Sequence, residues 1–141
     1  MNAADLRDLF ALETACFADF WSEKVLSEVL QDPNHLVLLR RDEFGAATAY
    51  FIGRLVADEA EIERIGVAPA ARGRGLGGEV LDEALETWRD LGAMRVFLEV
   101  RASNFVAQQL YVSRGFEIVA KRARYYDDGE DALIFGLEIG A

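Results

Sequence analysis

The sequence predicts a single α/β domain organised around one mixed sheet. The chain has 141 residues, a length typical of one domain that buries most of its unfolded surface. Short segments with the alternation of strands lie between segments with the 3.6-residue spacing of amphipathic helices. No repeat, low-complexity segment or linker interrupts this succession, so we expect the strands and helices to share one core.

Composition favours a soluble globular protein. Hydrophobic residues make up 52% of the chain, and no apolar run approaches the roughly 20 residues of a membrane-spanning helix. The segment Met1–Asp5 lacks the basic start of a secretory signal, so we expect a cytoplasmic location and no membrane partner. Cys16 is the only cysteine and His35 the only histidine, which excludes an internal disulfide and argues against a zinc site.

The chain is strongly acidic, with 25 acidic residues against 15 basic ones and a net charge of −10. This balance argues against a nucleic-acid partner, because such surfaces neutralise phosphates with basic side chains. Two interpretations of the acidic surface stay open. It is simply solvated, or its field attracts a cationic amine or a basic peptide.

The first half of the chain predicts two helices and three strands. Ala4–Phe17 carries apolar residues at helical spacing, with Cys16 as a packed thiol at its apolar end. Ser22 is a suitable N-cap for a second helix that ends before Pro33, and His35 follows in a turn with no evident chemical partner. The expected strands are Leu36–Arg40, Ala46–Val56 and Glu61–Val67, of which the first two form an antiparallel hairpin.

The second half predicts two more helices and three more strands. Leu76–Leu91 has apolar residues at 3.6-residue spacing, charged residues on its other face and Gly92 directly after it, which is typical of an amphipathic helix. The other expected elements are a strand over Arg95–Arg101, a helix over Asn104–Ser113 ended by Gly115, and strands over Phe116–Arg124 and Ala132–Ile139.

The loop before the long helix has the composition of an anion site. Four of the six residues from Gly73 to Gly78 are glycines, which lets a phosphate approach the backbone closely. A helix start has unpaired N–H groups and a partly positive dipole end, and Arg72 and Arg74 add full positive charge. The alternative is an ordinary loop that begins a helix.

Two well-known phosphate loops fit this stretch poorly. A P-loop requires Gly-Lys-Ser/Thr, whereas the only lysines are Lys24 and Lys121. Gly73, Gly75 and Gly78 satisfy G-x-G-x-x-G, but five residues separate this pattern from the preceding strand, and the chain offers only one strand-loop-helix-strand unit. A dinucleotide fold is therefore a minor alternative.

A polar group lies where the following strand and helix meet. Glu99 interrupts an otherwise apolar strand, where an ionised carboxylate is costly unless it is paired or hydrated. A pairing with Arg95 or Arg101 is the structural explanation. On the next helix Asn104, Gln108 and Tyr111 are spaced i, i+4 and i+7, so they share one face and predict a polar cleft lining.

These motifs resemble those of a known family. Arg72, Gly75 and Gly77 form Arg-x-x-Gly-x-Gly, which is similar to the pyrophosphate-binding motif of the GNAT acyltransferase superfamily. The segment Leu98–Asn104 (Leu-Glu-Val-Arg-Ala-Ser-Asn) resembles more specifically the RimI type of ribosomal-protein alanine N-acetyltransferase, and the similarity covers most of the chain after Trp21. It implies a mixed, mostly antiparallel sheet flanked by about four helices, here within one N-acetyltransferase domain over residues 1–141.

The resemblance also implies the chemistry. Such an enzyme moves an acetyl group from acetyl-coenzyme A to the N-terminal alanine of a small-subunit ribosomal protein, with Glu99 as general base, Tyr111 as general acid and no metal. Two backbone N–H groups near Ile65–Val67 would hold the thioester carbonyl. Tyr125, Tyr126 and the acidic segment 127–131 would flank the acceptor, unless they form an ordinary exposed turn. The implied coenzyme-binding residues are Ile65, Gly66, Val67, Arg72, Gly73, Arg74, Gly75, Leu76, Gly77, Gly78 and Asn104.

The sequence departs from the family pattern at two places. The family usually begins with a strand, and Met1–Asp5 is too short and polar to form a good one, so we expect the sheet to lack that edge. Asp127 follows Tyr126 where the family usually has a proline, which puts the acceptor specificity in doubt more than the reaction.

Two further functions stay open. The same chemistry would serve a small amine, a polyamine or a lysine side chain. A non-catalytic module would instead bind acyl-coenzyme A or a dinucleotide through Gly73, Gly75 and Gly78.

Overall fold

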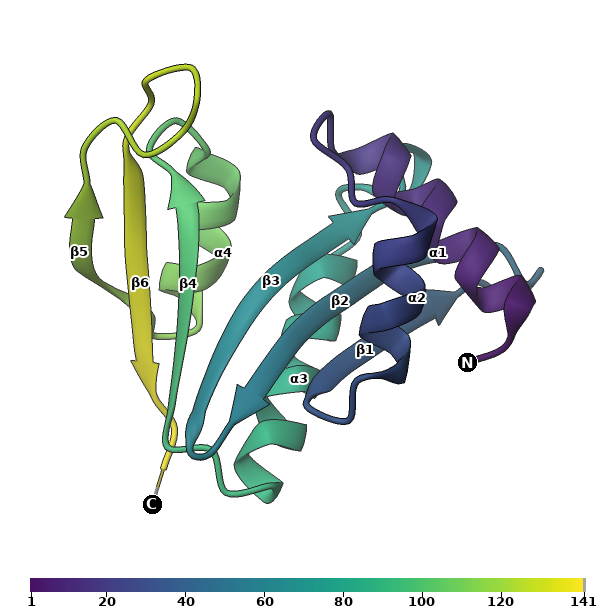
Figure 1. The fold of residues 1–141 in the computed structure, drawn as a ribbon, viewed down its shortest axis with the longest axis horizontal. Coiled ribbons are helices and arrows are strands. Elements are labelled where there is room, and N and C mark those ends of the chain that lie inside the picture. The colour runs from purple at the N-terminus through teal and green to yellow at the C-terminus, as the bar shows by residue number, and fades with distance from the viewer. Residues whose placement is uncertain (141) are drawn as a thin grey trace.

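The structure, a computed structural model, describes residues 1–140 and confirms an α/β fold with one mixed sheet (Figure 1). The helices are α1 (Ala3–Cys16), α2 (Glu23–Gln31), α3 (Leu76–Asp90) and α4 (Phe105–Ser113). The strands are β1 (His35–Arg41), β2 (Ala47–Val56), β3 (Glu59–Val67), β4 (Arg95–Arg101), β5 (Glu117–Arg122) and β6 (Ala132–Glu138). Across residues 1–140, every helix is too short or too polar to span a bilayer.

The sheet has the strand order β1-β2-β3-β4-β6-β5 and is mostly antiparallel. Only the central pair, β3 and β4, is parallel, and the crossover that joins them contains α3. Helices α1 and α2 cover one face of the β1–β3 half, while α3 and α4 lie on the opposite face of the sheet (Figure 1). This separation of the helices leaves the face of β4, β6 and β5 on the α1 side without a covering helix.

The two N-terminal helices begin where their sequences supply caps. The Asn2 side chain accepts a hydrogen bond from the Asp5 backbone N–H at 2.9 Å, and the Asp5 carboxylate accepts one from the Asn2 N–H at 3.0 Å. This capping box starts α1 at Ala3, so no strand precedes it in the described chain, as expected. Ser22 caps α2 as predicted, because its hydroxyl accepts from the Val25 N–H at 3.1 Å.

The core beneath α3 is arranged around Trp88. The indole is 1% exposed and meets the Phe51 ring edge-on at a centroid distance of 5.3 Å. On β2 the position opposite the indole is Gly53, where an added Cβ would overlap the Trp88 ring. The absence of a side chain at Gly53 therefore leaves the space on β2 that the Trp88 ring occupies.

The smaller core lies between α1, α2 and the other face of β2. Leu9 and Leu26 are fully buried there against Tyr50 and Ile52. Successive residues of β2 thus face different cores, as the two-residue period of a strand requires. The same alternation applies to β4 and decides which face carries Glu99.

The last antiparallel pair is shorter than the sequence predicts. We expected strands over 116–124 and 132–139, whereas β5 covers Glu117–Arg122 and β6 ends at Glu138. Phe116 is buried at 2% exposure after the α4 turn, and Arg124 adopts φ 51° while its N–H donates to the Asp131 carboxylate at 2.9 Å. The turn conformation at Arg124 ends the strand before the predicted boundary.

Replacing Trp88 with alanine should destabilise the protein by about 3–5 kcal/mol, because a large cavity remains under β2. Urea denaturation followed by circular dichroism measures this change. Leu91→Ala serves as the control, since Leu91 caps the same helix and is 65% exposed. Equal stabilities for the two variants would contradict the assignment of Trp88 to the core.

Candidate active site

Strands β3 and β4 separate at one end of the sheet (Figure 1). Their parallel pairing runs only from Glu59 and Arg95 to Ile62 and Leu98. Beyond this point β3 continues beside β2 alone, and β4 continues beside β6 alone. The carboxyl ends of the two central strands therefore form the walls of an opening.

A bulge in β3 lies directly at the point of separation. On β2, Gly53 pairs with Ile62 and Ile52 pairs with Arg64, so Glu63 is an extra residue in β3. A bulge bends its strand and increases the local twist. The bend at Glu63 explains why the pairing with β4 stops at Ile62.

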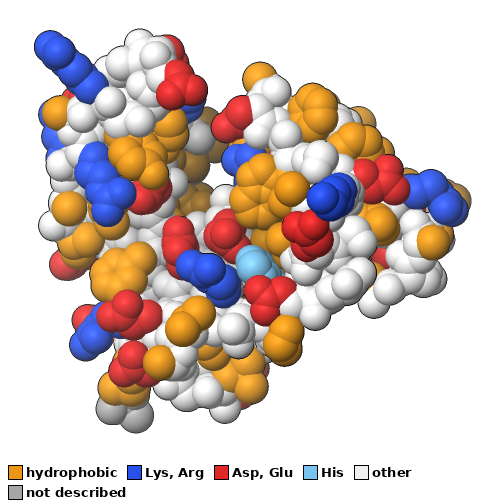
Figure 2. All heavy atoms as spheres, viewed as in Figure 1, with side chains coloured by type: hydrophobic (Ala, Val, Ile, Leu, Met, Phe, Trp, Pro, Cys, Tyr) orange, Lys and Arg blue, Asp and Glu red, His pale blue; other side chains and the backbone are white. Residues whose placement is uncertain are grey.

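Two cavities occupy the opening and share a wall. The larger, of about 660 Å³, reaches from the α1–α2 loop to the segment before β6. The smaller, of about 450 Å³, lies between the end of β3, the glycine loop and α4. The residues common to both are Cys16, Phe17, Ile65, Asn104, Ala107 and Tyr111. Figure 2 shows the hollow on the α1 face, with acidic and basic side chains around it.

The glycine loop borders the smaller cavity with bare backbone. Gly73 and Gly75 have φ 81° and 78°, and an added Cβ at either would meet nothing within 4 Å. Gly75 is the N-cap of α3 and provides no side chain to its first turn. The N–H groups at this helix start are therefore suited to an anion, so the structure fits the pyrophosphate of a coenzyme at this loop.

The other loop residues have more varied surroundings. Arg72 lines the cavity, and its Nε donates to the Val67 carbonyl at 3.1 Å. Arg74 is exposed and is not among the lining residues, so a contact between its side chain and the coenzyme stays a prediction. Gly78 lines the cavity but also packs against the Arg114 guanidinium, which pairs with Asp82 at 3.1 Å.

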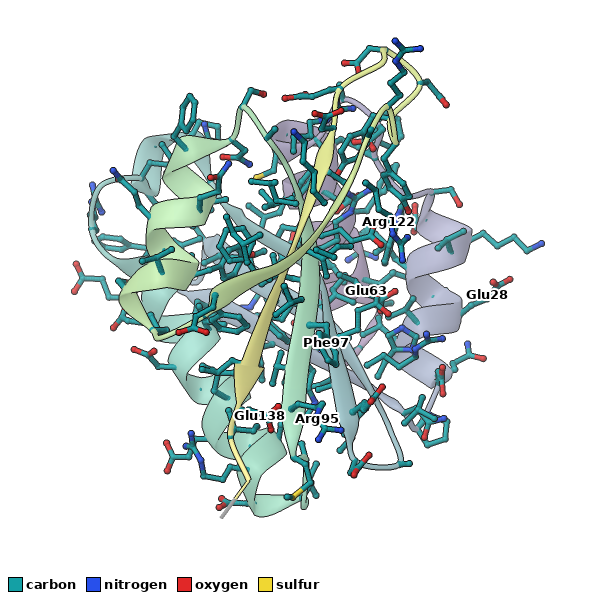
Figure 3. The ribbon with its side chains drawn as sticks, turned by 90° about the vertical axis from the view of Figure 1, so that its left-hand side faces the viewer. Glu28, Glu63, Arg95, Phe97, Arg122 and Glu138 are labelled. Carbon is teal, nitrogen blue, oxygen red and sulfur yellow. The ribbon has the colours of Figure 1, made fainter. Side chains whose placement is uncertain are left out.

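Glu99 reaches the larger cavity from the α1 face of β4. Its neighbours Leu98 and Val100 point into the α3 core, so Glu99 points the other way. Its carboxylate pairs with Arg122 of β5 at 3.1 Å, and its side chain is 29% exposed. Figure 3 shows Arg122 on the same side of the sheet as α2, which carries Glu28.

The expected partners of Glu99 were wrong. Arg95 pairs with Glu138 at 3.3 Å, and Arg101 pairs with Asp128 and Glu130 at 2.9 and 3.0 Å. The strand order explains the difference, since β6 lies between β4 and β5 and brings Arg122 alongside Glu99. The carboxylate is thus paired and partly hydrated rather than enclosed.

Tyr111 approaches from the opposite face and borders both cavities. It is 7% exposed and packs against Phe116 and Phe135 at centroid distances of 5.5 and 6.4 Å. Burial raises the pKa of the Tyr111 hydroxyl above its usual range. The phenol is therefore protonated at neutral pH, as a proton donor must be. Glu99 and Tyr111 both border the larger cavity, although they approach it from opposite faces of the sheet.

Comparison with known proteins places this geometry in a family. The model of the acetyltransferase (GNAT) family matches residues 6–116, which is well over half of the chain. The chain belongs to the GNAT acetyltransferase family. It is therefore an acetyl-coenzyme A-dependent N-acetyltransferase.

Several relatives of this GNAT chain extend over nearly its whole length. The N-alpha-acetyltransferase RimI of Mycobacterium tuberculosis is 38% identical, with 99% of this chain and 90% of the relative covered. The ribosomal protein bS18-alanine N-acetyltransferase of Salmonella typhimurium is 34% identical, with 99% and 95% covered. The crystal structure of the ribosomal-protein-S18-alanine N-acetyltransferase from Escherichia coli superposes with a TM-score of 0.91 at 34% identity, covering 100% of this chain and 92% of that one.

The predicted polar stripe of α4 is divided in this GNAT chain. Asn104 borders both cavities, but its side-chain oxygen accepts from the Ala107 N–H at 3.1 Å as the N-cap of α4. Gln108 instead donates to the carbonyls of Arg101 and Ala102 at 3.2 and 2.9 Å. It secures the β4–α4 turn, so only Asn104 and Tyr111 of the three line the cleft.

The segment between β5 and β6 borders the larger cavity through Tyr126, Asp128 and Glu130. Arg101 organises it, because its guanidinium lies 4.0 Å from the centre of the Tyr126 ring and pairs with both carboxylates. Hydrogen bonds from Ser103 and Arg101 lower the pKa of Glu130. Tyr125 is not among the lining residues of this cavity. A hydrogen bond with Glu99 raises the pKa of the Tyr125 hydroxyl.

The sequence offered no partner for His35, and the structure supplies two. Its Nδ1 lies 2.8 Å from Asp32 and its Nε2 lies 2.7 Å from Glu63, with 10% of the side chain exposed. Since Glu63 is the bulge residue, this histidine ties the end of α2 to the wall of the larger cavity. Asp32 is only three residues from His35, whereas Glu63 is 28 residues away and was not predictable from the local sequence.

The sequence analysis also missed Glu13 and Arg64. Glu13 has no exposed surface, and Arg64 borders the larger cavity. A local signal existed for Glu13, because it follows Leu9 and precedes Phe17 at four-residue spacing and so falls on the apolar face of α1. A charged residue on such a face requires a buried partner.

Gly75→Val should weaken the binding of acetyl-coenzyme A at least about tenfold, because a β-branched residue disfavours the left-handed backbone that presents the helix start. Isothermal calorimetry measures the affinity. Gly45→Val is the matched control, since Gly45 has φ 85° and equally open space but lies in the β1–β2 turn. Equal affinity in both variants would place the coenzyme elsewhere.

Proposed function

We propose that the chain transfers the acetyl group of acetyl-coenzyme A to the N-terminal α-amine of a protein, with alanine as the first residue. The observation that carries this proposal is the joining of two cavities at Tyr111, with Glu99 entering the larger one. The relatives named for ribosomal protein bS18 support a ribosomal-protein acceptor. We further propose that residues 1–141 form one such domain and that it acts in the cytoplasm, where ribosomal proteins are made.

The smaller cavity suits the coenzyme. In the proposal the pyrophosphate binds the backbone of Gly73–Gly78 and the start of α3, and the Arg72 side chain adds positive charge. The acyl arm extends along Ile65–Val67, where β3 has β2 on one side and no strand on the other. Backbone N–H groups on this open edge are suited to the thioester carbonyl as its negative charge develops.

The larger cavity suits the acceptor. An α-amine with a pKa near 7.7–8.0 loses its proton far more readily than a lysine side chain near 10.4. In the proposal Glu99 accepts this proton, directly or through one water, as the amine nitrogen attacks the thioester carbon. Arg122 holds the Glu99 carboxylate in place at 3.1 Å and balances its charge.

Tyr111 serves the departing sulfur. Collapse of the tetrahedral intermediate forms the amide and breaks the carbon–sulfur bond, and the leaving thiolate takes a proton from the phenol. Burial against Phe116 and Phe135 fixes the ring and keeps the hydroxyl protonated at neutral pH. The position of Tyr111 on the wall shared by both cavities matches this role.

A small amine or a lysine side chain is the second candidate acceptor. The acidic residues Asp19, Glu63, Glu99, Asp128 and Glu130 border the larger cavity, and a field of this sign attracts any cationic amine. An acceptor panel separates the candidates: a peptide beginning Ala-Arg, the same peptide with a blocked N-terminus and an internal lysine, and spermidine. The proposal requires the free N-terminal peptide to have the highest kcat/KM.

Glu99→Gln and Tyr111→Phe should each lower kcat for the Ala-Arg peptide by about 10²–10⁴-fold, because each removes a proton-transfer group. Thiol release measures the rate, and calorimetry checks that the affinity for the coenzyme stays within about threefold. Glu117→Gln, an exposed change on β5, is the control and should retain full activity. An unchanged rate in Glu99→Gln would show that this carboxylate is not the base.

A further inference from the structure

The carboxylate of Glu13 has no exposed surface and contacts three polar groups. Its Oε1 accepts a hydrogen bond from the Tyr50 hydroxyl at 2.5 Å, and its Oε2 accepts one from the Trp21 backbone N–H at 2.7 Å. The Nε of Arg64 lies 3.3 Å from the same Oε2, which is an ion pair without the geometry of a hydrogen bond. Glu13 therefore joins α1 to β2, to β3 and to the loop that leads into α2.

Arg64 extends this connection to the wall of the larger cavity. Its guanidinium lies 4.3 Å from the centre of the Phe17 ring and 4.9 Å from the centre of the Trp21 ring. It also donates to the Asp19 carbonyl at 3.0 Å. With 13% of its side chain exposed, Arg64 contacts three residues of one short loop while it borders the cavity.

The contacts of Arg64 converge on the segment Phe17–Asp19, which forms one side of the cavity. A buried ion pair is costly to desolvate and is weak evidence of stabilisation by itself. Here the pair joins α1 to β3 directly after the bulge at Glu63, and the same guanidinium contacts the loop between α1 and α2 through the Asp19 carbonyl and the Phe17 ring. Ile65, the next residue of β3, borders both cavities, so the loop is tied to the strand at the place where acceptor and coenzyme would meet.

We propose that Arg64, held by the buried Glu13, is a positioning residue that fixes Phe17 as a wall of the acceptor cavity and thereby restricts the acceptor to a small first residue. The inference rests on the proposed N-terminal acetyltransferase function. Phe17 borders both cavities, so in the proposal its ring lies beside the reacting amine. In the proposal, a fixed ring there leaves room for an alanine methyl group and disfavours a large branched side chain.

The test compares Arg64→Met with the parent chain on peptides that differ only in their first residue, alanine or leucine. Methionine keeps the apolar length of the side chain but cannot bond the Asp19 carbonyl or pair with Glu13. We expect the ratio of kcat/KM for alanine over leucine to fall at least about tenfold, mainly through KM, while the affinity for acetyl-coenzyme A changes by less than about threefold. Arg64→Lys keeps the charge and should restore part of the ratio.

A second measurement follows the loop without any acceptor. The chain has two tryptophans, and Trp88 is 1% exposed in the other core, so changes in acrylamide quenching report on Trp21. Arg64→Met should increase the quenching. Arg95→Met is the control. It removes an exposed ion pair at the start of β4, away from the opening, and should change neither the quenching nor the peptide ratio.

The outcomes are separable. An unchanged alanine-to-leucine ratio in Arg64→Met overturns the inference, whether or not the variant is less stable. Unchanged quenching also overturns it, because the loop would then be held without Arg64. A parent chain that acetylates neither peptide counts against the proposed function instead, and the quenching still decides whether Arg64 positions the loop.

Discussion

The separation of β3 from β4 is the constraint on which the site depends. Four residue pairs hold the two central strands together, and the bulge at Glu63 then bends β3 away. Without this divergence, Glu99 and Tyr111 would lie on opposite faces of a closed sheet and could not reach a common substrate. Because of the opening, Glu99 and Tyr111 border the same cavity although they come from opposite faces of the sheet.

The surrounding structure keeps this opening from collapsing. Beside the larger cavity, Arg101 pairs with Asp128 in the segment before β6, and Arg64 donates to the Asp19 carbonyl in the loop after α1. Beside the smaller cavity, Gly73 and Gly75 expose the start of α3, while Gly78 leaves space for the Arg114 side chain. Charged pairs thus stabilise the rim, whereas the interior between the cavities is formed by apolar and aromatic residues such as Phe17 and Tyr111.

Local sequence patterns were sufficient to predict most of the elements and a glycine-rich loop at the start of α3. Hydrophobic periodicity located α3, and Ser22 and Gly92 marked helix ends that the structure confirms. The glycine-rich loop does border a cavity at a helix start, although Arg74 is not among the residues that line it. These features depend on residues close together in the chain, where spacing and backbone preference carry the information.

The partners of individual site residues were not predictable in the same way. Glu99 pairs with Arg122 because β6 inserts between β4 and β5, and this strand order cannot be inferred from the two segments themselves. His35 and Glu13 likewise find partners on β3 and β2 that are distant in sequence. Gln108 has the spacing of a cleft residue, yet its side-chain amide donates to two backbone carbonyls in the turn after β4 and so does not line the cleft.

The most direct test of this account is a crystal structure with a bisubstrate ligand, in which an acetyl bridge joins coenzyme A to the N-terminus of an Ala-Arg peptide. The account predicts the pyrophosphate on the backbone of residues 73–78 and the bridge between the Glu99 carboxylate and the Tyr111 hydroxyl. A ligand bound outside the opening between β3 and β4, or a bridge that neither side chain reaches even through one water, would contradict it.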